Sequence, residues 1–288
     1  MLSNDANQEL VDAAGAGRLE QVSRLIAQGA DARLRDSEAL LAAASSGHAE
    51  CVELLVQLSD AKEDRSGALF CAAENGHVEC IKRLLPVSDA RARASGALRI
   101  AASRGWVECV KLLLPRSNPK DRYSGALAGA AEHGHFECVK LLLPVSDATA
   151  MDSYALSWAA NYGHAECVKL LLPESDAKIQ WSRALRWAAG GGHAECVRLL
   201  LPASHPVLEI RGLLGNVMAG GSAKVAALLI GEEPRLLDGM DLLECMGAAV
   251  EKKHGDLAAL LSSIIDKQEL SGLAQRESTQ RAAASPRL

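Results

Sequence analysis

The hydrophobic and polar positions along the chain follow one pattern that returns at a fixed interval. The segment GHFECVKLLLPVSDA at 134–148 comes back almost unchanged as GHAECVKLLLPESDA at 163–177. The glycines that open six of its copies lie 29 residues apart, at Gly47, Gly76, Gly105, Gly134, Gly163 and Gly192. Related copies begin at Gly17, Gly221 and Gly255. The chain is therefore predicted to consist of about nine repeated units.

Each copy of this segment predicts one short amphipathic helix. Phe136, Val139, Leu142 and Leu143 have the spacing of a single apolar stripe on a helix. On the opposite side, an acid precedes a base by three residues, which stabilises a helix modestly, at Glu79–Lys82, Glu108–Lys111, Glu137–Lys140, Glu166–Lys169 and Glu195–Arg198. The helix is predicted to begin at the residue after the glycine. It should stop at the proline that follows the leucines, namely Pro86, Pro115, Pro144, Pro173 or Pro202.

A second helix is predicted upstream of each glycine. A serine precedes an Ala- and Leu-rich stretch in six units, at Ser37, Ser66, Ser95, Ser124, Ser153 and Ser182. Serine is a favoured N-cap, because its hydroxyl accepts a free N–H group of the first turn. Glycine then ends the stretch. The units therefore predict a stack of helix–turn–helix repeats in which each repeat contacts its neighbours.

These units resemble ankyrin repeats. The resemblance is carried by LVDAAGAGRLEQVSRLIAQGADA at 10–32, by the Ala-Ala-x-x-Gly-His string at 72–77 and by VKLLL at 110–114, and it extends over about residues 7–265. It implies an all-α, ankyrin-like helix–turn–helix solenoid of about nine repeats. The family repeat has 33 residues, and the four that are missing here fall where the family has its β-hairpin finger. Shortened fingers are therefore expected.

A second departure from the family lies at the start of each repeat. The family's Thr-Pro-Leu-His is replaced here by sequences such as those at 67–70 and 96–99. The Thr–His hydrogen bond of the family should therefore be missing, and the recurring serine is expected to take over part of its role. The solenoid is predicted over residues 1–266, with 240–266 as a C-terminal capping unit, and 267–288 as a polar, disordered tail.

Composition narrows the class of partner. Apolar residues make up 49% of the 288 positions but aromatic residues only 3%, so the core must be built from small aliphatic side chains. The formal charge of −5 argues against nucleic acid as the main partner, because phosphate binding needs an excess of basic residues. The sequence shows no apolar run of membrane-spanning length and no conventional signal peptide. Eight cysteines are interpreted as reduced thiols, which favours the cytoplasm or another reducing intracellular compartment.

Two columns of residues could carry chemistry. One holds Cys51, Cys80, Cys109, Cys138, Cys167 and Cys196, and the other holds His48, His77, His135, His164 and His193. Members of a column lie one repeat apart, which is too far for a disulfide between packed helices and unlike the converging ligands of a zinc site. Both columns are interpreted as structural, and Cys71 and Cys245 also as core residues. We expect no metal and no cofactor.

The sequence does not predict an enzyme. It contains no nucleophile–base motif, no phosphate-binding loop and no dinucleotide-binding glycine pattern. A thiol-dependent enzyme stays open as an alternative, and it would need an exposed cysteine of low pKa. We therefore expect no catalytic residues.

The residues that differ between otherwise identical repeats are the candidates for binding another protein. Arg, Tyr and Trp contribute much of the energy of protein interfaces. The predicted partner-binding residues are Arg91, Arg93, Arg104, Arg122, Tyr123, His133, Tyr162 and Trp181. An alternative is a nucleic-acid-binding strip formed by Arg91, Arg93, Arg99, Arg104, Lys120 and Arg122. A further alternative, which rests on the family resemblance alone, is an ankyrin-repeat effector that acts on proteins of a host cell.

Overall fold

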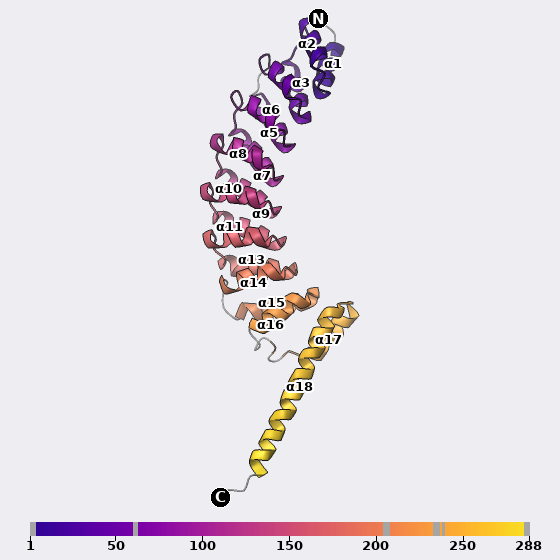
Figure 1. Cartoon of the computed structure of the whole chain (residues 1–288), viewed down its shortest axis with the longest axis vertical. Helices are drawn as coiled ribbons and strands as arrows, with labels where there is room; N and C mark the ends of the chain where they lie inside the picture. The colour runs from indigo at the N-terminus through magenta and orange to yellow at the C-terminus, as the bar shows by residue number, and fades with distance from the viewer. Residues whose placement is uncertain (1–3, 60–62, 204–207, 233–236, 238–239, 285–288) are drawn as a thin grey trace. The chain divides into compact units, whose positions relative to one another are not determined.

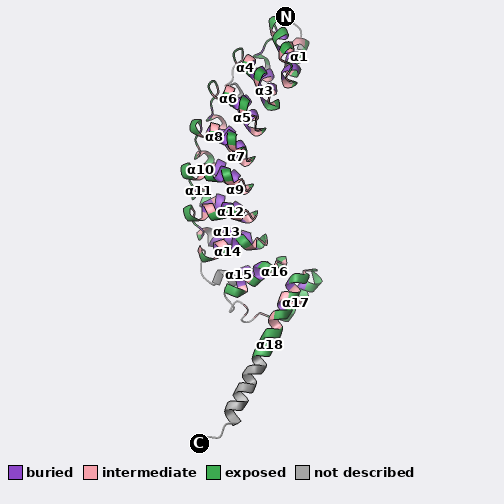
Figure 2. Ribbon diagram, in the orientation of Figure 1, coloured by how far each residue is buried: buried purple, intermediate pink, exposed green. Residues whose placement is uncertain are grey.

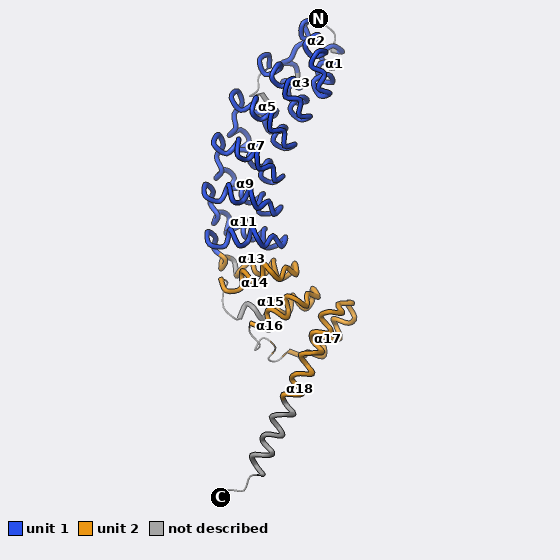
Figure 3. Tube along the Cα trace, viewed as in Figure 1, with its two compact units in different colours: residues 1–176 blue, residues 177–288 orange. Residues whose placement is uncertain are grey.

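The computed structural model describes the backbone of residues 4–59, 63–203, 208–232, 237 and 240–284. Side chains within helices at 4, 35–36, 63–65, 180–181, 208–212 and 272–284 also lie outside the described part. Everything described is helix, turn or loop, and it contains no strand. The chain divides into two compact units, residues 1–176 and 177–288 (Figure 3). The architecture is the all-helical solenoid that the sequence predicts.

The first unit consists of six helix pairs (Figure 1). The first helix of each pair packs against the first helix of the next, and the second helices form a parallel row in the same way. Short 3₁₀ helices follow three of the pairs: η1 (Leu114–Arg116), η2 (Leu143–Val145) and η3 (Leu172–Glu174). The paired helices are α1 (Asn4–Gly15) and α2 (Leu19–Ala27), α3 (Leu34–Ser46) and α4 (Ala49–Leu55), α5 (Glu63–Glu74) and α6 (Val78–Leu84), α7 (Ala92–Ser103) and α8 (Val107–Leu113), α9 (Asp121–Glu132) and α10 (Phe136–Leu142), and α11 (Ala150–Asn161) and α12 (Ala165–Leu171).

The second unit contains three further pairs. They are α13 (Ile179–Gly190) and α14 (Ala194–Leu200), followed by η4 (Leu201–Ala203), then α15 (Leu208–Gly220) and α16 (Ala223–Glu232), and α17 (Leu242–Glu251) and α18 (Gly255–Ala284). Helix α13 packs on α15, and α16 packs on both α14 and α18. Helix α18 continues through residues 267–284, within the segment that the sequence predicts to be a disordered tail. The Leu, Ala, Gln, Glu and Arg residues of that segment are good helix formers, which accounts for the continuation.

Buried positions recur in successive helix pairs (Figure 2), and the same few residue types, mainly Ala, Leu, Val and Cys, occupy them. In the fourth repeat, Leu98, Ala101 and Ala102 of α7 are fully buried against Val110 and Leu113 of α8. The six cysteines of the recurring column are 0–1% exposed, as expected for core residues. Cys71 and Cys245 are only partly buried, which corrects the interpretation that they are core positions.

Tight turns take the place of the β-hairpin fingers. The α-helices α8, α10 and α12 end before the proline, as predicted, and the proline then lies within one turn of 3₁₀ helix. In the following turn the Asp147 carboxylate accepts the backbone N–H of Thr149 at 2.9 Å, and Asp89 accepts that of Arg91 in the same way. An aspartate that hydrogen-bonds the backbone two residues on stabilises a turn without a strand.

The recurring serines link neighbouring repeats and do not act as N-caps. The Ser66 hydroxyl accepts the backbone N–H of Asp89, and the Ser95 hydroxyl accepts that of Asn118, each at 2.9 Å. Ser124 and Ser153 make the equivalent bonds 23 residues onward. The N-cap interpretation is therefore wrong. These serines are buried and have left-handed backbone dihedrals, so their hydroxyls point away from the first turn of their own helix.

The recurring histidines also link neighbouring repeats. The Nε2 atom of His135 lies 3.0 Å from the carbonyl oxygen of Ser103 in the preceding repeat, and His164 reaches Glu132 in the same way. At the position where the column has Trp106, the indole N–H donates to the carbonyl of Glu74 at 3.1 Å. What the position requires is thus an N–H donor on a flat ring, which agrees with a structural role.

The acid–base pairs on the second helices form only in part. Lys82–Glu79 and Lys111–Glu108 are ion pairs at 2.6 Å, and Arg198 pairs with Glu195. Among the described residues, the pairs predicted on α10 and α12 do not approach within ion-pair distance. Exposed pairs of this kind contribute little stability. No helix in the described part of the chain combines the length and the apolar character needed to cross a membrane.

Candidate functional site

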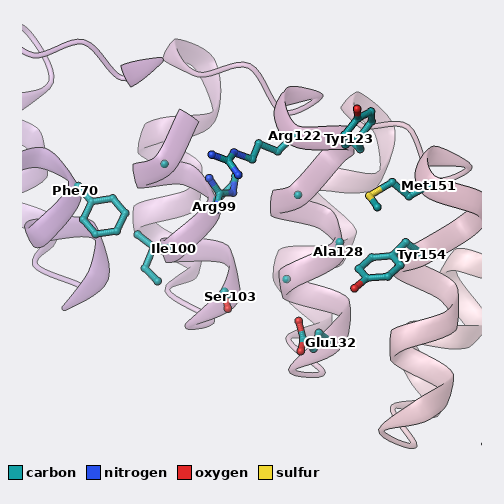
Figure 4. A pocket seen from close by; sticks show the side chains of 13 residues that line it. Phe70, Arg99, Ile100, Ser103, Arg122, Tyr123, Ala128, Glu132, Met151 and Tyr154 are labelled. Atoms are coloured by element: carbon teal, nitrogen blue, oxygen red, sulfur yellow. The ribbon is translucent and has the colours of Figure 1, made fainter. Parts of the chain in front are cut away.

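A groove crosses the first helices of four successive repeats in the first unit (Figure 4). Its volume is about 550 Å³, and it is open to solvent along one side. The lining residues come from α5, α7, α9 and α11. They belong to Phe70, Gly96, Arg99, Ile100, Ser103, Arg122, Tyr123, Gly125, Ala128, Gly129, Glu132, Met151 and Tyr154.

Helix periodicity explains why these residues face the groove. In α7, the positions 97, 98, 101 and 102 are buried and carry Ala, Leu, Ala and Ala, as do the equivalent positions of α9 and α11. The intervening positions 96, 99, 100 and 103 form the opposite face, because residues three and four apart share one side of a helix. Positions 99, 100 and 103 differ from repeat to repeat, whereas position 96 is glycine in three of the four repeats. A constant face is therefore buried between repeats, while a variable face lines the groove.

The groove contains two neighbouring arginines. Figure 4 shows the side chains of Arg99 and Arg122 pointing toward one another. Neither guanidinium has an ion pair or hydrogen bond among the described residues. Burial and, to a smaller extent, the neighbouring charge of Arg122 lower the pKa of Arg99, and the charge of Asp121 opposes this shift only in part. Two like charges at one point of a partly buried groove form a local excess of positive charge on an acidic chain.

Aromatic and thioether side chains flank these arginines. Tyr123 is 71% and Met151 is 52% exposed, and both lie on the groove. Tyr154 begins a row of rings along α11: its ring meets that of Trp158 edge-on at 5.4 Å, and Trp158 stacks on Tyr162 at 5.4 Å. Exposed aromatic and Met side chains are typical of surfaces that bind other proteins.

The structure brings together only some of the predicted binding residues. Arg122 and Tyr123 line the groove. Tyr162 lies at the far end of the ring row, beyond the groove lining, and is 48% exposed. Arg91 is exposed, and nothing groups it with the groove. The side chain of Trp181 lies outside the described residues.

The remaining predicted residues have contacts within the chain. Arg104 forms an ion pair with Glu74 at 3.5 Å. The guanidinium of Arg93 lies over the ring of Phe70, 5.1 Å from its centre. His133 stacks on His135 with ring centres 6.1 Å apart, and its Nδ1 lies 3.0 Å from the Gly129 carbonyl. The binding role of these residues remains a prediction.

Sequence reasoning misses part of the groove. It does not predict Phe70, Ile100 and Tyr154 as binding residues, and it proposes Arg99 only for nucleic acid. All four occupy the variable positions of the first helix. A comparison of repeats position by position, restricted to the helix face opposite the constant Ala-Leu-x-x-Ala-Ala string, would identify them.

The cysteine column shows no sign of reactivity. Burial raises the pKa of Cys80, Cys109, Cys138 and Cys167 to about 11. All eight cysteines are free thiols. In the part of the chain that the structure describes, no three His, Cys, Asp or Glu side chains are grouped so that they could hold a metal ion. The features that a thiol-dependent enzyme would need are therefore not found in this column.

Comparisons with known proteins agree with this architecture. The family model described as "Ankyrin repeats (3 copies)" matches residues 10–95, 86–152 and 127–210. Among solved structures, the human ASB11 ankyrin repeat domain is similar, with a TM-score of 0.60 and 24% sequence identity. The alignment covers 69% of this chain and 98% of the ASB11 chain. No curated protein sequence matches the chain. Because the family matches extend over most of the chain, the protein belongs to the ankyrin repeat family.

Proposed function

We propose that the protein is a non-enzymatic scaffold that binds another protein in the groove formed by α5, α7, α9 and α11. One observation carries this proposal: apart from two recurring glycines, the groove is lined by residues that change between repeats, while the constant Ala and Leu residues are buried between repeats. Ankyrin repeats generally serve as protein-binding scaffolds, which supports the same function. A rigid stack also loses little conformational entropy when it binds.

The groove is also suited to a peptide or loop in its dimensions and chemistry. It runs across four repeats and offers apolar contacts at Tyr123 and Met151 and charges at Arg99 and Arg122. Eight free thiols favour a reducing intracellular compartment as the place of action.

The test compares two double variants of the full chain as baits for partner capture. Tyr123→Ala with Met151→Ala removes exposed groove side chains. Val87→Ala with Val145→Ala removes two other exposed apolar side chains, 40% and 41% exposed, in the turns after the second helices. Proteins recovered by the wild type should be at least tenfold depleted with the groove variant and retained with the control. Both variants should melt within a few degrees of the wild type, since exposed substitutions change stability little. Equal recovery by both variants would show that the groove does not bind the partner.

Nucleic acid is the competing partner, and the structure weakens its case. Of the six residues in the proposed basic strip, Arg104 is paired with Glu74 and Arg93 is stacked on Phe70. Phosphate-backbone binding depends on several free cations and weakens steeply with salt. Retention of the wild type on single-stranded RNA or DNA that falls steeply with salt, together with no captured protein, would favour this alternative.

A further inference from the structure

The positive charge of the groove is confined to one place. Arg99 and Arg122 project toward each other across adjacent repeats (Figure 4). The nearby carboxylate of Asp121 is already engaged, because it accepts hydrogen bonds from the Ser95 hydroxyl and the Asn118 amide, each at 2.6 Å. Glu132 lies at the other end of α9 (Figure 4). Among the described residues neither arginine forms an ion pair with a carboxylate, although the charge of Asp121 favours the charged form of Arg99.

Two guanidinium groups that lie side by side repel each other, and an anion bound between them relieves that repulsion. Burial and the adjacent like charge both disfavour the charged form of Arg99. Gly125 allows this close approach: a Cβ atom there would lie 3.3 Å from Cδ and Nε of Arg99. The repeat thus places a partly buried guanidinium against bare backbone and beside a second guanidinium. An anion bound between the two would replace repulsion by two attractive interactions.

We propose that the arginine pair, Arg99 and Arg122, binds the phosphate group of a phosphorylated side chain on a partner peptide that lies in the groove. The inference rests on the proposed function, because it assigns the chemistry of the protein partner. A phosphomonoester carries close to two negative charges at neutral pH, and so matches two guanidinium groups where one carboxylate would match only one. Guanidinium groups bind phosphate through pairs of parallel hydrogen bonds. Tyr123 and Met151 then contact the neighbouring apolar side chains of the peptide.

The same observations favour a peptide over a nucleic acid. A nucleic-acid strand presents a phosphate at every step and would need cations along the whole groove. The groove has cations at one point only, and Glu132 lies farther along it. The chain as a whole carries a net charge of −5. A single phosphate on an otherwise uncharged segment fits this distribution, whereas a polyanion does not.

The test uses fluorescein-labelled nonapeptide pools with random flanks and one fixed central residue. The central residue is phosphoserine, phosphotyrosine, unmodified Ser or Tyr, or Glu, and binding to the full chain is measured by fluorescence anisotropy. At least one phosphorylated pool should bind ten times more tightly than its unmodified form and than the Glu pool. Arg99→Gln with Arg122→Gln should abolish this preference. Arg99→Lys with Arg122→Lys should reduce it, because lysine keeps the charge but not the paired hydrogen bonds.

Two controls separate this effect from net charge and from unfolding. Arg24→Gln with Arg116→Gln removes two exposed charges outside the groove and should leave binding unchanged. Arg122→Gln alone removes an exposed side chain, and its melting temperature should equal or exceed that of the wild type because repulsion is relieved. If it melts much lower, the two arginines do not repel each other and the proposal is overturned.

The outcomes distinguish this inference from the proposed function. Equal binding of phosphorylated, unmodified and Glu pools overturns the phosphate assignment, and so does tighter, arginine-dependent binding of a single-stranded oligonucleotide. If the Tyr123/Met151 variant still loses its captured partner in those cases, the groove remains a protein-binding site of different chemistry. If partner capture is also unaffected, the proposed function fails as well.

Discussion

The glycine that precedes each second helix provides a sharp test of how repeats are linked. Gly105 has a left-handed backbone, with φ of +76°, and a Cβ atom placed on it would lie 2.5 Å from Nδ1 of His135 in the next repeat. In Gly105→Ala the left-handed backbone costs about 1–2 kcal/mol. Displacing the imidazole also breaks its hydrogen bond to the Ser103 carbonyl, which costs about 1–3 kcal/mol more. The expected total is about 2–5 kcal/mol.

Two other glycines separate the backbone cost from the ring contact. Gly192 has φ of +74°, but its Cβ would meet only Ser222, with the hydroxyl oxygen at 3.3 Å. Gly192→Ala should therefore cost about 1–2 kcal/mol. A Cβ atom added at Gly190 would meet no other atom within 4 Å, and the backbone there has no positive φ. Gly190→Ala should therefore be neutral or stabilising by up to about 1 kcal/mol.

Thermal unfolding and local hydrogen exchange measure this series. At roughly 2–4 °C per kcal/mol for a unit of this size, Gly105→Ala should lower the melting temperature by on the order of 10 °C. Hydrogen exchange should show the loss in α7–α10, since neighbouring repeats stabilise one another. In the double variant Gly105→Ala with His135→Ala, the ring contact is gone, so the two costs should be less than additive by at least about 1 kcal/mol. A Gly105→Ala cost no larger than that of Gly192→Ala would refute the ring contact between repeats.

Three further predictions concern a recurring serine, a recurring histidine and the buried thiols. Ser95→Ala should lower the free energy of unfolding by about 1–3 kcal/mol in urea titrations, because the Asn118 N–H loses its acceptor and Asp121 loses one of its two donors. Exposed Ser46→Ala should change it little. Burial, followed by the charges of His133 and His164, lowers the pKa of His135. The contribution of His135 to folding stability is therefore complete above about pH 6.5 and is lost as the pH falls. His135→Trp should flatten the fall in melting temperature between pH 7 and 5, and an unchanged slope would contradict this. Because burial raises the pKa of four thiols to about 11, folding stability should fall as the pH rises from 9 toward 11. A thiol reagent should label the partly buried Cys71 and Cys245 well before those four. Rapid labelling of any of the four would contradict their burial.

Periodicity predicts the repeats and their core because each apolar stripe can be buried only against another copy. The helices, the loss of the β-hairpin fingers and the burial of the cysteine column all follow from the 29-residue spacing and the small side chains. The turns are less predictable. Arg122, Tyr123 and Ser124 adopt consecutive left-handed dihedrals, although none of the three is a glycine. Nothing local in that sequence indicates this conformation, so the sequence suggests an N-cap at Ser124, whose hydroxyl instead binds the next repeat.

The binding site is predictable only in part, for a related reason. Tyr123 and Arg122 stand out in the sequence because they interrupt a repeated pattern. Whether a variable side chain faces the groove depends on its place around the helix and on its neighbours in the next repeat. Arg104 varies as strongly as Arg99, but Glu74 of the preceding repeat pairs with it. Arg99 has no such ion-pair partner among the described residues. This difference becomes visible only when it is known how one repeat stacks on the next.

Site-specific photo-crosslinking tests most directly the claim that variable side chains on the groove bind a partner while recurring ones hold the stack. A photoreactive amino acid placed at position 151, on the groove, should yield a defined protein adduct in cells. The same amino acid at position 145, which is similarly exposed in η2, should yield none. Adducts of equal amount and identity from both positions, or adducts from position 145 alone, would contradict the account.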